Sequence, residues 1–243
     1  MTERKRYARQ ILLPEVGESG QDVLAGASVT IVGVGGLGSP AAMYLAAAGV
    51  GNIRLIDPDP VELSNLNRQL LHHQEDYETS RAKVESAKMK LRSLNPEITV
   101  EGVRERLDLK NAARLVQKPN VVLDCLDNYD ARHDLNRYCV TNGLKLVHAA
   151  VEGWRGQMTT IFPGKTCCIS CLVPRSPKRE GPIPIIGAVA GTFGCMEANE
   201  AIKTILGLPG VLQGRLLIGD LLEQSWETID VERNPHCPVC KGI

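Results

Sequence analysis

Four glycines at fixed spacing indicate a site for a phosphate group. They match the pattern G-x-G-x-x-G and are Gly33, Gly35, Gly36 and Gly38. The pattern lies between an expected buried strand at 28–34 and an expected helix at 36–48, where glycine backbone and free N–H groups can approach a phosphate closely. Asp57, at the end of the next expected strand, is placed to accept hydrogen bonds from ribose hydroxyls. The alternative is that the glycines serve only close helix packing.

Two C-x-x-C pairs predict a metal site. The pairs are Cys168 with Cys171 and Cys237 with Cys240. Four thiolates in two such turns give closed tetrahedral coordination of zinc, which is a structural rather than a catalytic arrangement. A redox disulfide is the alternative, and two matched pairs argue against it. Cys167 is a rival ligand, although it breaks the two-residue spacing.

The charge balance excludes some classes of protein. The 243 residues include 28 Lys and Arg against 28 Asp and Glu, so the formal net charge is zero. Proteins that coat nucleic acid or acidic membranes carry an excess of positive charge. We therefore expect no direct nucleic-acid partner and no membrane surface.

One uncharged stretch, residues 23–53, is long enough to cross a membrane, but seven glycines and prolines interrupt it from 33 onward. It is better explained as a strand, a tight turn and a buried helix. The first residues carry charges and no apolar run, so we expect no secretory signal and a cytoplasmic location.

Apolar runs and turn residues alternate along the first 150 residues. Strands are expected at 28–34, 52–57, 98–103, 120–125 and 144–149, and helices at 36–48, 80–94, 108–116 and 128–141. This alternation predicts an α/β fold, a Rossmann-like, mostly parallel sheet with flanking helices.

The rest of the chain completes one expected domain over 1–243. An N-terminal helical arm of two short helices (1–27) precedes the nucleotide-binding half (28–150), and a C-terminal half (151–243) follows. In the last part we expect antiparallel strands at 157–162, 215–219 and 225–231, an irregular proline-rich loop at 174–184, a helix at 187–206 and the zinc knuckle.

Four motifs together resemble the MoeB/ThiF/HesA family, the prokaryotic relatives of ubiquitin-activating enzymes. They are DPDPVELSNLNRQ at 57–69, RAKVESA at 81–87, DCLDN at 124–128 and YARQ at 7–10. The resemblance covers essentially the whole chain. It implies an adenylation domain with a four-cysteine zinc site, which uses ATP to adenylylate the C-terminal glycine carboxylate of a ubiquitin-like sulfur carrier.

The resemblance also implies roles for single residues. Arg68 and Lys83 would bind the triphosphate, Asp127 would hold Mg²⁺, and Arg9 would reach across a homodimer into the partner's site. The implied nucleotide contacts are Gly33, Gly35, Gly36, Gly38, Asp57, Ser64, Asn65, Leu66, Asn67, Arg68, Lys83, Asp127 and Asn128. We expect these basic side chains to give the pocket a local excess of positive charge.

Taken singly, these residues have ordinary explanations. Arg68 and Lys83 could be solvated charges, and Asp127 could simply cap the following helix. The loop between Arg68 and Lys83 is also longer than in typical relatives, which makes Arg81 a rival for the phosphate-binding position. The match of 83–87 to the family pattern favours Lys83.

The source of sulfur is a separate question. Some family members carry a reactive cysteine in the crossover loop, but residues 175–184 contain none. Cys125, Cys139 and Cys195 are interpreted as core packing, and a sulfur-relay role for Cys195 or Cys167 stays open. We expect sulfur from another protein, a cysteine desulfurase or a rhodanese.

The resemblance leaves the carrier and the pathway open. Molybdopterin, thiamine and thiolated tRNA are the candidate products, and the carrier would end in Gly-Gly. Small residues at 187–194 weakly support a homodimer, although they could also pack within one chain. The rival functions are a tRNA-modifying dehydratase of the same superfamily, a nicotinamide or flavin oxidoreductase, and a scaffold that binds nucleotide without turnover.

Overall fold

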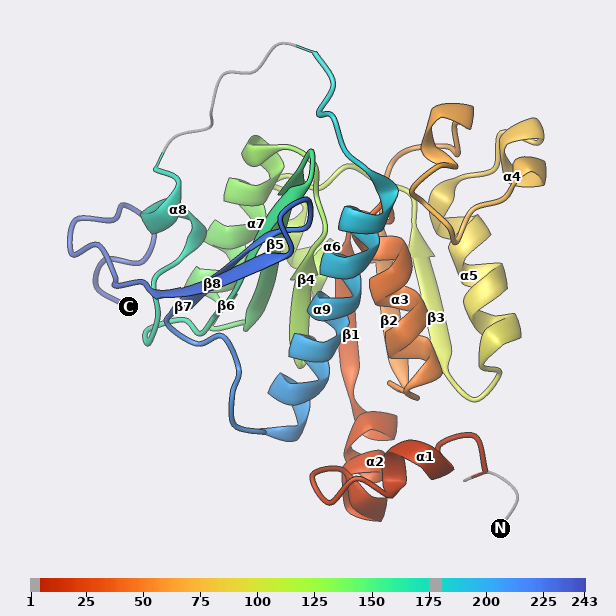
Figure 1. Ribbon diagram of the computed structural model, residues 1–243, viewed down its shortest axis with the longest axis horizontal. Helices are drawn as coiled ribbons and strands as arrows, with labels where there is room; N and C mark the ends of the chain where they lie inside the picture. Colours follow the sequence, from red (N-terminus) through yellow and green to blue (C-terminus); the bar gives the residue numbers. More distant parts are fainter. Residues whose placement is uncertain (1–4, 175–180) are drawn as a thin grey trace.

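One sheet of eight strands organises the part of the chain that the computed structural model describes, residues 5–174 and 181–243 (Figure 1). The strand order is β3-β2-β1-β4-β5-β6-β7-β8. The strands are β1 (Ser28–Val32), β2 (Asn52–Ile56), β3 (Thr99–Val103), β4 (Val121–Asp124), β5 (Leu146–Glu152), β6 (Arg155–Ile161), β7 (Arg215–Asp220) and β8 (Ser225–Asp230).

The parallel half contains the point at which the strand order reverses. β1 pairs in parallel with β2 on one side and with β4 on the other, and β3 and β5 extend the two edges. All four residues of β4 are buried, as expected for a strand covered on both faces. In such sheets a ligand binds outside the carboxyl ends of the strands, at the point of reversal.

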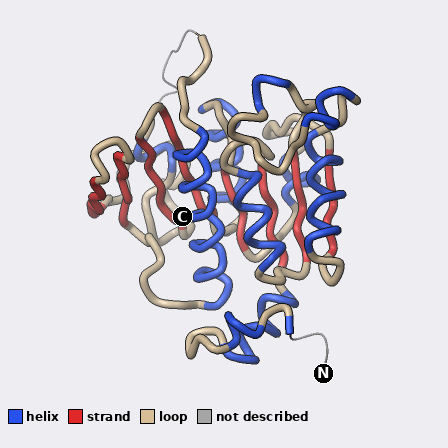
Figure 2. The backbone as a smooth tube through the Cα atoms, turned by 45° about the vertical axis from the view of Figure 1, so that its right-hand side comes forward, coloured by secondary structure: helices blue, strands red, loops and turns tan. Residues whose placement is uncertain are grey.

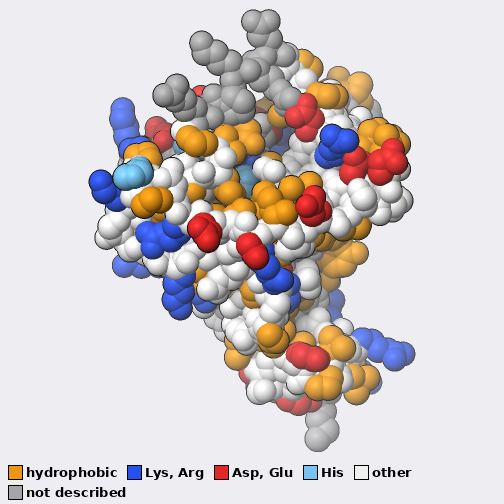
Figure 3. Space-filling view, turned by 60° about the vertical axis from the view of Figure 1, so that its left-hand side comes forward, with side chains coloured by type: hydrophobic (Ala, Val, Ile, Leu, Met, Phe, Trp, Pro, Cys, Tyr) orange, Lys and Arg blue, Asp and Glu red, His pale blue; other side chains and the backbone are white. Residues whose placement is uncertain are grey.

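The antiparallel half runs from β5 to β8. Gly153, with φ of +58°, lies in the turn between β5 and β6. Every residue of β8 is exposed, and Trp154, Leu222 and Trp226 are large apolar side chains on this half that remain 46%, 61% and 46% exposed. Figure 3 views the side on which β7 and β8 lie in Figure 1, and it shows hydrophobic side chains gathered over the middle of the face.

Helices cover both faces of the sheet (Figure 2). They are α1 (Ala8–Ile11), α2 (Gly17–Gly26), α3 (Gly38–Ala47), α4 (Gln74–Glu78), α5 (Lys83–Leu94), α6 (Ala112–Val116), α7 (Tyr129–Thr141), α8 (Ile169–Leu172) and α9 (Gly187–Leu206), with a 3-10 turn at Leu63–Asn65. α3, α5 and α9 pack with Ile31 and Leu55 on one face, whereas α6 and α7 pack with Val32 and Ile56 on the other. The predicted α/β fold with a mostly parallel sheet is confirmed.

One predicted helix was wrong in its extent. The expected helix at 80–94 begins only at Lys83, because residues 81–83 are extended alongside residues 59–61: Val61 N–H donates to Arg81 O, and Lys83 N–H donates to Asp59 O. Ser80, with φ of +49°, separates this segment from α4. Of the expected proline-rich loop at 174–184, residues 175–180 lie outside the described residues.

The helical arm lies at the amino ends of the parallel strands (Figure 1). Tyr7 Oη donates to Glu97 Oε2 at 2.7 Å and accepts from Asn95 Nδ2 at 2.8 Å, which joins the arm to the end of α5. Gln10 Nε2 donates to Ala48 O, just after α3. Among the described residues, no helix has the length and apolar character needed to cross a bilayer.

Candidate functional site

The glycine loop joins β1 to α3 at the point where the strand order reverses. Gly33 has φ of +93°, and a Cβ there would lie 2.5 Å from Cys125 O, so only glycine fits beside the chain leaving β4. A Cβ on Gly38 would clash with Gly33 O in the same way. α3 then begins without a side-chain cap. Ser39 N–H donates to Gly35 O and Pro40 has no N–H, so the backbone donors that an anion could use are those of the glycine loop just before the helix.

Asp57 closes this loop from the end of β2. Its Oδ2 accepts from Val34 N–H at 2.8 Å and its Oδ1 from Asp59 N–H at 2.9 Å. Burial raises the pKa of Asp57, and Lys83 with the two backbone donors offsets only part of that rise. The carboxylate is therefore fixed at the pocket, in a position that matches its predicted role on a ribose.

Lys83, rather than Arg81, points into the pocket. The Lys83 ammonium lies 3.3 Å from Asp59 Oδ2 and 4.0 Å from Asp57 Oδ1. The Arg81 guanidinium lies on the other side of the extended segment, where its Nη1 donates to Asp76 Oδ1 at 2.6 Å. Side chains two residues apart in an extended segment point to the same side. Arg81 and Lys83 therefore point apart only because the chain turns into α5 at Lys83.

Two predicted triphosphate ligands lie at the 3-10 turn Leu63–Asn65: Asn65 ends the turn and Arg68 follows it. Asn65 is buried and its Oδ1 accepts from Glu62 N–H at 3.3 Å, while Arg68 Nη1 donates to Ser64 O at 2.7 Å. A Cβ on Gly36 would lie 3.7 Å from Arg68 Cγ, so the turn lies against the glycine loop. Ser64 and Asn67 are exposed, and Leu66 is half-buried.

Asp127 and Asn128 follow β4 on the opposite wall of the same pocket. Asn128 caps α7, because its Oδ1 accepts from Ala131 N–H at 2.9 Å. Its Nδ2 donates to Asp127 Oδ1 at 3.2 Å. The ordinary capping role considered for Asp127 thus belongs to its neighbour, and the Asp127 carboxylate faces the pocket.

The pocket brings six of the predicted residues together. Its walls include Gly33, Gly35, Asp57, Lys83, Asp127 and Asn128. It also includes four polar residues that the sequence did not single out, Asp59, Gln69, Glu105 and Arg106. Gln69 is buried and its Oε1 has no partner in the described residues, so an unsatisfied acceptor lies beside Gly35. No sequence signal separates Gln69 from its polar neighbours at 64–68.

The predicted excess of positive charge was wrong. Among the described residues, the walls carry four carboxylates, from Asp57, Asp59, Glu105 and Asp127, against two cations, Lys83 and Arg106. The extra carboxylates come from loops after β2 and β3, whose direction the sequence does not reveal. A triphosphate in this pocket needs further positive charge, and the exposed carboxylate of Asp127 is of the type that binds Mg²⁺ alongside phosphate.

Arg9 is the predicted residue that lies far from this pocket. It is exposed on α1, in the arm at the amino ends of the strands, whereas the pocket lies at their carboxyl ends. Arg9 therefore does not reach the pocket of its own chain.

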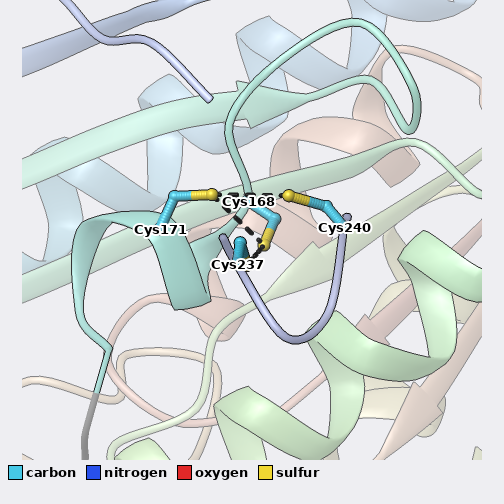
Figure 4. A group of neighbouring side chains, drawn as sticks. All are labelled: Cys168, Cys171, Cys237 and Cys240. Carbon is cyan, nitrogen blue, oxygen red and sulfur yellow. Dashed lines mark hydrogen bonds between the residues drawn. The ribbon is translucent and has the colours of Figure 1, made fainter. Parts of the chain in front are cut away.

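The four predicted cysteines converge (Figure 4). All four Sγ atoms lie within 4.8 Å of one another, with 3.9 Å for Cys168–Cys171, 3.7 Å for Cys168–Cys237 and 3.4 Å for Cys171–Cys240. A tetrahedral Zn–S bond of about 2.3 Å sets its sulfurs about 3.8 Å apart, so the spacing fits a metal. It is far longer than the roughly 2.05 Å of a disulfide.

The two thiols of the C-terminal knuckle differ, because burial raises the pKa of Cys240 to about 11, whereas that of Cys237 is lowered. Burial opposes ionisation of Cys237, but the backbone N–H groups of Cys240 and Val239 outweigh it and lower the pKa of Cys237 to about 7. Cys167 is not part of the group of four.

The remaining cysteines are poor nucleophiles. Burial raises the pKa of Cys125 and Cys139, both core residues as predicted. It also raises the pKa of Cys167 to about 11 and that of the half-buried Cys195. At neutral pH these thiols stay protonated, which gives no support to a sulfur relay through them.

Small residues of α9 pack inside the chain. A Cβ on Gly187 would clash with Asn67 O, one on Gly194 would clash with Leu37 O, and Ala190 contacts Gly36. α9 thus lies directly against the glycine loop and against Asn67 and Arg68, which follow the 3-10 turn. These contacts explain three of the small residues without a second subunit, whereas Gly191 has no neighbour within 4 Å of its Cβ position among the described residues.

A glycine loop, two carboxylates and a buried lysine around one pocket at the strand reversal are typical of nucleotide-binding α/β enzymes. The model of the ThiF family matches residues 7–239. The SAMP-activating enzyme E1 of Haloferax volcanii is 42% identical over 245 residues, which span 98% of this chain and 89% of that protein. The sulfur carrier protein adenylyltransferase of Thermus thermophilus is 39% identical over 249 residues, with 98% and 91% covered.

A solved structure agrees with these relatives. E. coli MccB, crystallised with MccA-N7isoASN, has a TM-score of 0.87 at 25% identity and covers 100% of this chain, which spans 76% of that one. The chain belongs to the ThiF family, and it is an ATP-using adenylyltransferase. The resemblance drawn from the motifs is confirmed.

Proposed function

We propose that the protein uses ATP to adenylylate the C-terminal glycine carboxylate of a ubiquitin-like sulfur-carrier protein. The observation that carries the proposal is the convergence of the glycine loop, Asp57, Lys83 and Asp127 on one pocket at the strand reversal. The names of two relatives, a SAMP-activating enzyme and a sulfur carrier protein adenylyltransferase, support a carrier protein as the substrate.

In this proposal each wall of the pocket holds one part of ATP. Asp57 accepts hydrogen bonds from the ribose, and the N–H groups of the glycine loop just before α3 bind phosphate oxygens. Asn65, Arg68 and Lys83 bind the rest of the triphosphate. Lys83 is held by Asp57 and Asp59, so it would exchange carboxylate partners for phosphate when ATP enters.

The reaction is one displacement at phosphorus. A carboxylate oxygen of the carrier attacks the α-phosphorus, a new P–O bond forms, and the bond to the bridging oxygen breaks to release pyrophosphate. Negative charge grows on the phosphate oxygens, so the protein contributes positioning and electrostatic stabilisation rather than a nucleophile. Asp127 would hold Mg²⁺, which would supply further positive charge to a pocket whose walls are mainly acidic.

The other parts of the proposal concern assembly. A zinc ion bound by the four cysteines ties the C-terminal residues to α8, and it has no open position for catalysis. In a homodimer, Arg9 enters the partner's pocket, which is consistent with its distance from its own. A separate cysteine desulfurase or rhodanese then supplies sulfur to the adenylylated carrier, for molybdopterin, thiamine or thiolated tRNA.

The carrier would contact the antiparallel half. Trp154, Leu222 and Trp226 offer exposed apolar area there, before β6, between β7 and β8, and in β8 respectively. The flexible tail of the carrier would then run over the start of α9 toward the glycine loop.

An isotope-exchange assay tests this function. The protein, ATP and labelled pyrophosphate are incubated with candidate carriers, and we expect label to enter ATP only with a carrier that ends in Gly-Gly. A carrier without its terminal glycine is the control. If the protein binds ATP but no Gly-Gly carrier supports exchange, the proposed substrate class is wrong.

A further inference from the structure

A buried ion pair lies directly behind the loop that carries Asp127. Asp124 ends β4, Arg132 lies in the first half of α7, and the two side chains are 0% and 4% exposed. Arg132 Nη1 donates to Asp124 Oδ2 at 3.0 Å and to Ala149 O at 2.6 Å. His148 Nδ1 lies 2.7 Å from the same Asp124 oxygen. The pair thus joins β4, β5 and α7 at one point.

The same two side chains hold both backbone groups of Leu126. Leu126 N–H donates to Asp124 Oδ1 at 3.2 Å. Leu126 O accepts from Arg132 Nη2. The peptide that leads into Asp127 is therefore fixed on one side, and the Asn128 cap fixes the chain on the other.

The arrangement depends on the shape of the guanidinium group. Arg132 reaches three acceptors on three different segments, Asp124, Leu126 and Ala149, with two nitrogens of one planar fork. A lysine ammonium could still neutralise Asp124, but it presents no such fork. Charge and geometry at this position can therefore be separated by experiment.

We propose that Arg132 is a positioning residue which, through Leu126, holds the Asp127 carboxylate at the pocket and so sets the affinity of the ATP site for its divalent cation. This inference rests on the metal-binding role proposed for Asp127. Groups that orient metal ligands commonly change metal affinity by about 10-fold to 100-fold when they are substituted.

The test is ATP binding as a function of Mg²⁺ concentration, measured by calorimetry on the full chain. Arg132→Lys should raise the Mg²⁺ concentration for half-maximal ATP binding by about 10-fold, and excess Mg²⁺ should restore binding. Arg137→Lys, an exposed position on the same helix, is the matched control and should leave the Mg²⁺ dependence unchanged.

A second variant tests the same proposal if Arg132→Lys does not fold. Asp124→Asn keeps the size of the side chain and weakens its hold on Arg132, so it should shift the Mg²⁺ dependence in the same direction. Circular dichroism identifies which variants are folded. A folded Arg132→Lys or Asp124→Asn variant with the wild-type Mg²⁺ dependence would overturn the proposal, because a purely structural role would lower stability alone.

The measurement also separates this inference from the proposed function. ATP titration needs no carrier protein, so a wild-type protein that binds Mg·ATP without adenylylating any carrier would contradict the proposed substrate and leave the Arg132 result valid. If wild-type ATP binding does not depend on Mg²⁺, the role of Asp127 and with it this inference are wrong.

Discussion

At the scale of single residues, the charge of Lys83 decides what the pocket can accept. Its side chain is 9% exposed, and its ammonium lies between Asp57 and Asp59. Removing that charge would leave two carboxylates facing an incoming triphosphate. Arg81, two residues earlier, is instead paired with Asp76 outside the pocket.

A pair of matched substitutions tests this assignment. Lys83→Gln should lower the rate of pyrophosphate exchange by about 100-fold, the effect of removing one preorganised donor to a reacting anion. Arg81→Gln should leave exchange unchanged and lower the free energy of unfolding by about 1–2 kcal/mol, because Asp76 loses a charged hydrogen bond. Pyrophosphate-exchange assays and urea unfolding of both variants test this assignment. Equal loss of exchange in the two would contradict the assignment.

The sequence could predict the glycine loop, Asp57 and Asp127, because each follows an expected strand and the carboxyl ends of parallel strands meet at one edge. It could not predict the sign of the pocket's charge. Asp59 and Glu105 enter the pocket from loops, and nothing in their spacing shows which way those loops turn. The family pattern favoured Lys83 over Arg81, but the helical pattern concealed the extended segment that separates the two side chains.

At the scale of elements, His72 joins the glycine loop to α5. Its Nε2 donates to Val34 O at 2.9 Å, and its Nδ1 lies 3.0 Å from Ser86 Oγ. Ser86 Oγ also lies 2.8 Å from Asp76 Oδ2, which belongs to α4. Burial lowers the pKa of His72 to about 4, with Lys90 and Lys83 acting in the same direction, so the folded protein holds the ring neutral.

This burial predicts a pH dependence of stability. The folded pKa of His72, about 4, lies below its unfolded value. The stability that depends on the neutral ring is therefore fully present above pH about 6.5 and is lost as the pH falls toward 4. Wild type should lose about 2 kcal/mol more than His72→Gln between pH 7 and pH 5. Denaturant unfolding at the two pH values measures the difference. Other buried histidines, such as His148, contribute equally to both proteins.

Parallel pH profiles for wild type and His72→Gln would show that the ring titrates normally in the folded state. The link between the glycine loop and α5 would then be weaker than its contacts indicate.

At the scale of the whole molecule, the four cysteines join segments far apart in the sequence. α8 and the C-terminus lie together at one side of the sheet, away from β1 and β2 (Figure 1). A metal there closes a loop of chain between Cys168 and Cys237, which are 69 residues apart. The pocket at the strand reversal, where ATP is proposed to bind, shares none of its described wall residues with this site.

Metal removal should therefore lower the stability of the protein and leave its affinity for nucleotide unchanged. Closure of a loop of this length is worth about 4 kcal/mol if the metal acts like a covalent link, so chelation under reducing conditions should lower the melting temperature by about 10 °C. ATP affinity, measured well below the lowered melting temperature, should not change. Cys240→Ser should reproduce the effect and Cys195→Ser should not. A melting temperature that chelators leave unchanged would argue against a bound metal.

The fold class and the meeting of the two C-x-x-C pairs could be predicted, because they depend on local pattern and on the regular handedness of parallel connections. The arm could be predicted only as two helices. Its position at the amino ends of the strands follows from contacts of Tyr7 and Gln10 with residues near 48 and 95–97, which no local pattern encodes. That position is what leaves Arg9 without access to its own pocket.

The most direct test of the account is the product itself. The protein is incubated with ATP labelled in the α-phosphate and with a carrier that ends in Gly-Gly, and the carrier is analysed by intact mass and by label. We expect one AMP on the C-terminal carboxylate of the carrier, and none when the terminal glycine is removed or when Lys83→Gln replaces the wild-type protein. If the wild-type protein binds ATP and AMP never appears on any such carrier, the central claim is contradicted.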